Sequence, residues 1–155
     1  MDESVAIGYI EKAVKSLHVA EICLKGKEYE DVISNAYYAM FFTAEALLYC
    51  DGMEYKDHKG VISNFGKEYS KTNKVEKGLH TDFINLFNER NRVDYQLKTE
   101  ITEQYASESL GKSVLFVKYI AVYINESKLK NPKVEQIIKG RTIRGIEYYG
   151  AKYIK

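Results

Sequence analysis

The 155-residue chain has few cysteines and histidines, two of the former and three of the latter, and it has no tryptophan. The cysteines, Cys23 and Cys50, form no metal-ligand spacing and the histidines are scattered, so we expect no metal site. We place both cysteines near the C-terminal ends of two consecutive antiparallel helices, roughly 30 Å apart at about 1.5 Å rise per residue. A disulfide needs Cα atoms within about 7 Å, so we expect no intrachain bridge.

Long apolar runs are also missing. No segment approaches the roughly 20 apolar residues that cross a bilayer, so we expect no contact with a membrane. The first residues, Met1-Asp2-Glu3-Ser4, are acidic and no basic-then-apolar secretory pattern follows, which predicts a cytoplasmic location. The chain has no internal repeat, no low-complexity tract and no glycine-rich phosphate loop, and we expect no cofactor.

What the chain does have is typical of a globular domain. Hydrophobic residues make up 45% and charged residues 29%, and the length suffices for one domain with a real core. The net charge of +1 is unevenly distributed, since the segment from Lys128 onward holds eight Lys or Arg and two acids. We therefore divide the chain into a bundle, residues 1–127, and a basic, tyrosine-rich extension, residues 128–155.

Apolar residues at spacings of three and four predict an all-α fold. We expect an up-and-down antiparallel bundle of about five helices with a basic C-terminal extension. The five helices are predicted over residues 3–25, 29–49, 58–69, 76–98 and 102–125. A short sixth helix should begin at Pro132 and end near Gly140, and we find no helical period from Arg141 onward.

Two of these predictions concern the core. The helix over residues 29–49 is apolar on more than one side, so it is either the central helix of the bundle or an interface helix. The inner faces predict that the following side chains are buried: Tyr37, Met40, Phe65, Phe83, Leu86, Val114 and Val117.

The fourth helix contains the most informative stretch, residues 88–95. Its apolar face, which we take from Leu79 to Leu97, turns Arg90 and Asp94 toward the side where a core should be. An ionised pair is costly there unless it is hydrogen-bonded or wetted by a cleft. The pair is either a structural clasp that also holds Tyr37 or Tyr38, or it lines a polar groove.

Asp57 is a good N-cap for the third helix and places His58 in the first turn. His58 is then either a solvated first-turn residue or a contact for an anion, because helix N-termini attract phosphate.

Three segments resemble one branch of the HEPN domain family. These are NAYYAMF at 35–41 with EALL at 45–48, HKGVISNFGKE at 58–68, and RNRVDY at 90–95, which is similar to that branch's Arg-x-x-Ala-Asp-Tyr. The resemblance covers about Ile7 to Ile124. It implies a small helical bundle, usually dimeric, with a polar cleft at or near the interface.

The resemblance also implies alternatives for function. Many members are ribonucleases, including toxins of toxin–antitoxin pairs encoded beside a minimal nucleotidyltransferase, and others are nucleotide- or RNA-binding modules. Catalytic members have an arginine followed four to six residues on by a histidine. Here the arginine matches Arg90, but Tyr95 stands near the histidine position and no histidine follows His80. Tyrosine, with a pKa near 10, is a poor general base at neutral pH, so we predict weak or absent ribonuclease activity.

Our main hypothesis is a binding module that works as a homodimer and contacts nucleotide or RNA phosphate, or a nucleotidyltransferase partner. Its ligand-binding residues would be Arg90, Arg92, Tyr37, Tyr38, His58 and Lys59. One alternative is a metal-independent ribonuclease using Arg90, Asp94 and Tyr95, with His58 or His80 brought in by folding or across a dimer. The other is an inert structural partner subunit.

The basic extension allows two interpretations. Its cations and tyrosines suit RNA phosphates and unpaired bases. They also suit an acidic protein surface, and the extension could fold back onto the chain's own acidic first 127 residues or onto a dimer mate.

Overall fold

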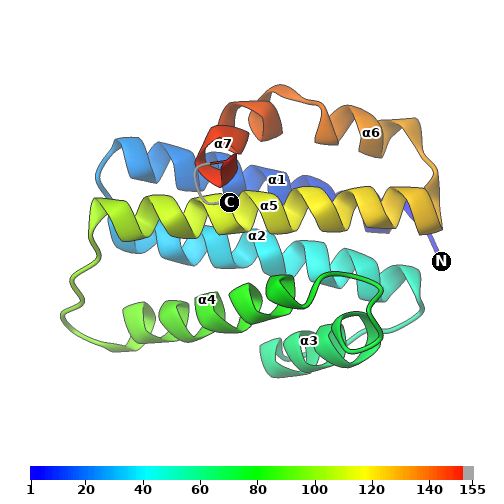
Figure 1. Cartoon of the computed structure of the whole chain (residues 1–155), viewed down its shortest axis with the longest axis horizontal. Coiled ribbons are helices and arrows are strands. Elements are labelled where there is room, and N and C mark those ends of the chain that lie inside the picture. Colours follow the sequence, from blue (N-terminus) through cyan, green and yellow to red (C-terminus); the bar gives the residue numbers. More distant parts are fainter. Residues whose placement is uncertain (152–155) are drawn as a thin grey trace.

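The computed structural model describes residues 1–151, without the side chains of Tyr148 and Ala151. The elements in this range are α1 (Glu3–Lys25), α2 (Tyr29–Cys50), α3 (His58–Phe65), α4 (Lys77–Tyr95), α5 (Glu103–Ile124), α6 (Pro132–Ile138) and α7 (Arg141–Ala151), with π-helical turns η1 (Gly66–Ser70) and η2 (Asn125–Leu129). The long helices α1, α2, α4 and α5 run alternately in opposite directions (Figure 1). The prediction of an all-α, up-and-down bundle is confirmed.

Two of the four long helices begin at a side-chain cap. Asp2 accepts a hydrogen bond from the Ser4 backbone N–H and begins α1, and Thr102 does the same for Tyr105 at the start of α5. One predicted boundary is wrong: α4 ends at Tyr95, and Leu97 beyond it is fully exposed and does not belong to the apolar face. Leu97 continues the three-and-four spacing of the apolar residues in the sequence, but the helix has already ended at Tyr95.

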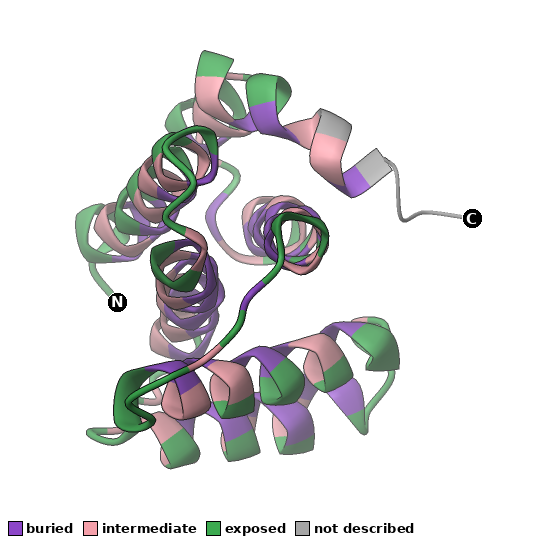
Figure 2. Cartoon of the chain, turned by 90° about the vertical axis from the view of Figure 1, so that its left-hand side faces the viewer, coloured by how far each residue is buried: buried purple, intermediate pink, exposed green. Residues whose placement is uncertain are grey.

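Helix α2 lies at the centre of the bundle. It contacts α1, α5, α4 and α3, and more than half of its residues are buried. Its broad apolar surface is therefore covered within one chain, and it gives no separate argument for an interface with a second copy. All seven side chains predicted to form the core are buried, and the buried residues of the long helices face one another in the interior (Figure 2).

The segment from Arg141 differs from the prediction of no helical period. It forms α7, which packs on α5 and α1, with Ile143 and Ile146 each 1% exposed. A Cβ at Gly150 would meet Leu115 at 2.9 Å, so the helix approaches α5 closely at this glycine. The sequence contains a helical spacing here, at Ile143, Ile146 and Gly150. These residues form only a short apolar stripe among charged residues, so the sequence pattern did not reveal the helix. Residues 152–155 of the predicted extension lie outside the described residues, and the boundary at 127/128 stays a prediction.

One carboxylate joins three segments at one end of the bundle. Asp51, which follows α2, accepts a hydrogen bond from the Tyr69 hydroxyl of η1 at 2.5 Å and pairs with Lys128 of η2 at 2.7 Å. Burial opposes ionisation, but the contacts with Lys128 and Tyr69 lower the pKa of the Asp51 carboxyl. The ends of α2, α3–η1 and α5–η2 are thus held together.

Both cysteines are free thiols, as predicted. Among residues 1–151, none of the helices has the length and apolar character needed to pass through a bilayer.

Candidate functional site

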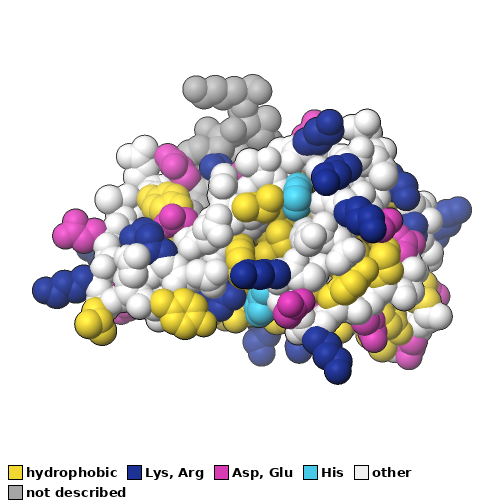
Figure 3. Space-filling view, turned by 90° about the horizontal axis from the view of Figure 1, so that it is seen from below, with side chains coloured by type: hydrophobic (Ala, Val, Ile, Leu, Met, Phe, Trp, Pro, Cys, Tyr) yellow, Lys and Arg dark blue, Asp and Glu magenta, His cyan; other side chains and the backbone are white. Residues whose placement is uncertain are grey.

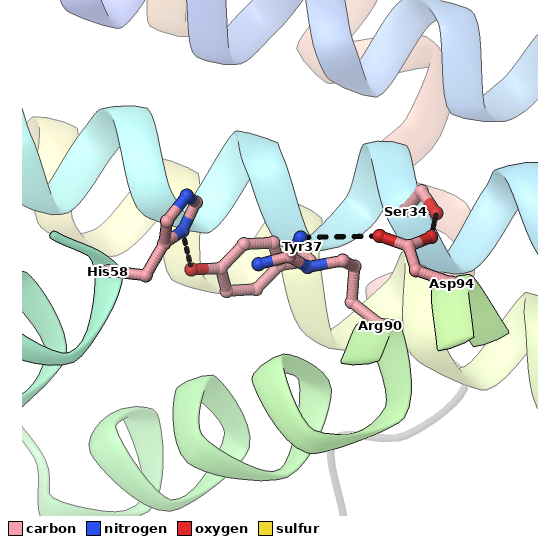
Figure 4. A network of polar contacts seen from close by, with 5 residues as sticks. All are labelled: Ser34, Tyr37, His58, Arg90 and Asp94. Atoms are coloured by element: carbon pink, nitrogen blue, oxygen red, sulfur yellow. Dashed lines mark hydrogen bonds and ion pairs between the residues drawn. The ribbon is translucent and has the colours of Figure 1, made fainter. Parts of the chain in front are cut away.

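Arg90 projects from the inner face of α4 and is only 9% exposed. Its Nη1 donates a hydrogen bond to Oδ2 of Asp94, one turn later, at 3.2 Å. The Asp94 side chain is 38% exposed, and its other oxygen lies 3.5 Å from the Ser34 hydroxyl of α2 (Figure 4). The ion pair therefore has a buried cation and a carboxylate at the surface.

Aromatic rings surround the guanidinium. Its Cζ atom lies 5.0 Å from the ring centre of Tyr37, 5.5 Å from that of Tyr38 and 5.8 Å from that of Phe87. Such cation–π contacts hold an arginine where few hydrogen bonds are available. The Nε–H of Arg90 is buried and has no hydrogen-bond partner within the described residues.

His58 joins the same aromatic group from the first turn of α3. Its Nδ1 is 2.6 Å from the Tyr37 hydroxyl, and its ring stacks on Phe41 with centres 4.3 Å apart. Burial, and then the charge of Arg90, lower the pKa of the imidazole, and burial raises the pKa of the Tyr37 phenol. Both groups are therefore neutral at pH 7.

These six residues form one site, which we call the Arg90 cluster: Arg90, Asp94, Tyr37, Tyr38, Phe87 and His58. It offers one cation, one carboxylate at the surface, and a neutral imidazole connected to the cation through the Tyr37 ring. An arginine suits a phosphate oxygen, and a neutral imidazole near pH 7 suits a proton transfer.

Three residues of the predicted site lie outside this cluster. Arg92 forms a surface pair with Glu89, with nitrogen–oxygen distances of 3.2 and 2.9 Å. Tyr95, the last residue of α4, is 81% exposed. Lys59 is exposed and lines a neighbouring surface hollow whose wall includes Phe87.

Sequence reasoning proposed Arg90, Tyr37, Tyr38 and Asp94 as neighbours, and the fold brings them together. It left the contact between His58 and Tyr37 undetermined, because 21 residues and a helix connection separate the two. It missed Phe87 as a ring beside Arg90 and Ser34 as a partner of Asp94. Helical spacing could have found Phe87, which stands three residues before Arg90.

The acidic, histidine and cysteine side chains of residues 1–151 form no group of three that could hold a metal ion.

Comparisons with known proteins agree with the geometry. The HEPN domain model matches residues 8–123. The chain is 34% identical over 115 residues to "Putative toxin MJ0142" of Methanocaldococcus jannaschii, covering 74% of this chain and 78% of that protein. It is 30% identical over 117 residues to a "UPF0332 protein" of Thermotoga maritima, covering 76% and 89%, and 32% identical over 117 residues to "Putative toxin MJ0605" of M. jannaschii, covering 76% and 87%. With this match across most of its length, the chain belongs to the HEPN domain family.

Proposed function

We propose that this HEPN protein binds RNA through the Arg90 cluster, as the toxin-like member of a pair with a minimal nucleotidyltransferase. Two relatives bear the name toxin, which supports a role of this kind. The nucleotidyltransferase partner and a homodimeric state rest on the family resemblance. Sedimentation at micromolar concentration tests the dimer, and a clean monomer would contradict it.

One observation supports the binding function above the others. Within residues 1–151, the buried guanidinium of Arg90 has an unpartnered Nε–H, and Asp94, its only carboxylate partner in this range, is open to solvent. A guanidinium prefers two parallel hydrogen bonds to a carboxylate or phosphate, and the contact with Asp94 supplies one. A phosphate that displaces Asp94 or joins it would find the rings of Tyr37 and Tyr38 already holding the cation in place.

The test compares two arginines on the same helix. Arg90→Lys keeps the charge but removes the planar fork, and Arg92→Lys makes the same change at the surface pair with Glu89. We expect Arg90→Lys to weaken binding of a fluorescein-labelled RNA at least tenfold in fluorescence anisotropy, and Arg92→Lys to weaken it less than twofold. Circular dichroism must show both variants folded. Equal effects of the two changes would overturn the assignment of the RNA site to Arg90.

Metal-independent RNA cleavage is the second candidate function, and the position of His58 favours it. The sequence lacks a histidine after Arg90, but the fold supplies one from α3, in contact with Tyr37. In such a reaction His58 would accept the proton of the 2′-hydroxyl, the 2′-oxygen would attack phosphorus, and the 5′-oxygen would leave with a proton from solvent. Arg90 would neutralise charge on the phosphate.

We still expect cleavage to be slow, because the Nδ1 atom of His58 is occupied by Tyr37. End-labelled RNA is incubated with the protein in EDTA and analysed for 2′,3′-cyclic phosphate ends. Cleavage that His58→Gln abolishes while RNA binding persists would support this function. If the RNA remains intact in this incubation, the site does not cleave RNA, and RNA binding remains its proposed function.

A further inference from the structure

A surface hollow of about 380 Å³ lies beside the Arg90 cluster, between the α3–η1 segment and α4. Three lysines line it: Lys59 from the first turn of α3, Lys67 from η1, and Lys71 immediately after η1. We call it the lysine hollow. Figure 3 shows this face of the molecule, on which Lys and Arg side chains lie beside hydrophobic and histidine side chains, with acidic side chains interspersed among them.

The charge of the lysine hollow is uncompensated. No acidic side chain belongs to its lining, and within residues 1–151 none of its three lysines forms an ion pair. Three exposed cations that line one hollow create a positive potential there, and this potential stabilises an anion bound between them. The lysine hollow therefore suits a ligand with several negative charges.

Rings form the apolar part of the lysine hollow. The His80 ring lies against Gly66, where any Cβ would overlap it, and its Nε2 is 3.0 Å from the Ile62 carbonyl oxygen. Phe87 belongs both to this lining and to the Arg90 cluster, with its ring centre 6.3 Å from that of His58. The two sites are therefore continuous along α4.

We propose that the lysine hollow binds a stretch of single-stranded RNA that continues from the Arg90 cluster. The lysines contact backbone phosphates, and an unpaired base stacks on Phe87 or His80. A duplex would keep its base faces stacked on one another, so this combination of cations and rings selects a single strand. That the ligand is RNA rests on the proposed function. That it binds at the lysine hollow is a separate assignment.

The test uses fluorescence anisotropy with a labelled 12-nucleotide single-stranded RNA and a duplex of the same sequence. The variant combines Lys59→Ala, Lys67→Ala and Lys71→Ala. A matched control removes three exposed lysines from α1 and α6: Lys15, Lys25 and Lys133. We expect the first variant to weaken single-strand binding at least tenfold and to reduce the slope of log affinity against log salt by about 2, at about 0.7 per phosphate contact. The control should change affinity less than twofold.

A strand of the same length without bases separates stacking from charge. It keeps the phosphates, and we expect the unchanged protein to bind it at least fivefold more weakly than the normal strand. Equal binding of the two strands, or of single strand and duplex, would overturn the single-strand assignment.

The possible failures can be told apart. If Arg90→Lys abolishes RNA binding and the triple lysine variant does not, the lysine hollow is not part of the RNA site and the proposed function stands. If the triple variant abolishes binding and Arg90→Lys does not, the lysine hollow stands and the assignment to Arg90 fails. If the triple variant keeps RNA binding but loses a co-expressed acidic protein, the hollow is a protein-docking surface and the proposal is wrong.

Discussion

The α3–α4 side and the α7 side of the bundle both carry excess positive charge, but the surroundings of the charged side chains differ. On the side of α3 and α4, lysines line a hollow next to a buried arginine and several rings. On the side of α7, Ile143 and Ile146 pack inward while Arg141 and Arg144 point to solvent. The number of cations in the sequence favoured the C-terminal extension as a binding segment for RNA or an acidic protein surface. The packing shows that α7 is an amphipathic helix with exposed arginines and buried isoleucines, whereas burial and rings concentrate around Arg90.

The largest expected effect is on the α4 side. Phe83→Ala removes a fully buried ring that packs against Tyr37, Phe65 and Phe116. We expect the free energy of unfolding to fall by about 3–5 kcal/mol, measured by urea denaturation. A loss below about 1 kcal/mol would mean that the α4 side is not part of the core.

A smaller change on the other side tests whether α7 is structural only. Ile146→Ala should lower the free energy of unfolding by about 2–4 kcal/mol, since its side chain is 1% exposed against the bundle. RNA affinity and its salt dependence should stay within twofold of the unchanged protein under native conditions. A marked loss of RNA affinity in this folded variant would assign part of the RNA site to α7 and remove the contrast between the two sides.

The α3 side contains a titratable imidazole, that of His58, whose pKa is lower in the folded protein than in the unfolded chain. Burial and Arg90 lower the pKa of His58 in the folded protein, so the unfolded chain binds its proton first as the pH falls through about 6.5. The contribution of His58 to the free energy of unfolding should therefore decrease between pH 7.5 and 5.5, by on the order of 1 kcal/mol or less because the ring is partly solvated.

The measurement compares the unchanged protein with His58→Gln at both pH values. Glu45 acts in the opposite direction, because burial raises the pKa of its carboxyl to about 7 and favours the folded state at lower pH. Glu45 is present in both proteins, so the difference between them reports His58. A larger acid-induced loss in His58→Gln than in the unchanged protein would contradict the predicted sign.

The smallest effect concerns the ion pair between Lys118 of α5 and Glu147 of α7. Both side chains are about one third exposed, so Lys118→Ala should cost about 0.5 kcal/mol or less. The apolar face of α7 would then account for nearly all of its attachment. A loss well above 1 kcal/mol in urea denaturation would show that charge, rather than apolar packing, holds this helix.

The sequence predicted the bundle well because its long helices have strong periodicity, and because several helices begin at a clear cap. Thr102 and Asp57 begin helices where expected, and the predicted core residues are buried. At the site, the neighbours of Arg90 on α2 followed from helical faces alone. The position of His58 depended on how the connection after α2 turns, which has no local signal. The docking of α7 depended on two isoleucines among charged residues, a stripe too short to stand out.

The carboxylate of Asp51 has a consequence for the order in which the molecule opens. It serves both Tyr69 and Lys128, which lie on segments far apart in the chain. Any fluctuation that frays the end of α5 removes Lys128 from Asp51, so one of the two contacts that fix this carboxylate beside η1 is lost. Amide hydrogens of η1 and η2 should therefore exchange with deuterium as one cooperative unit, although more than fifty residues separate them. Lys67 of η1 and Lys71 immediately after it would become mobile together with that unit.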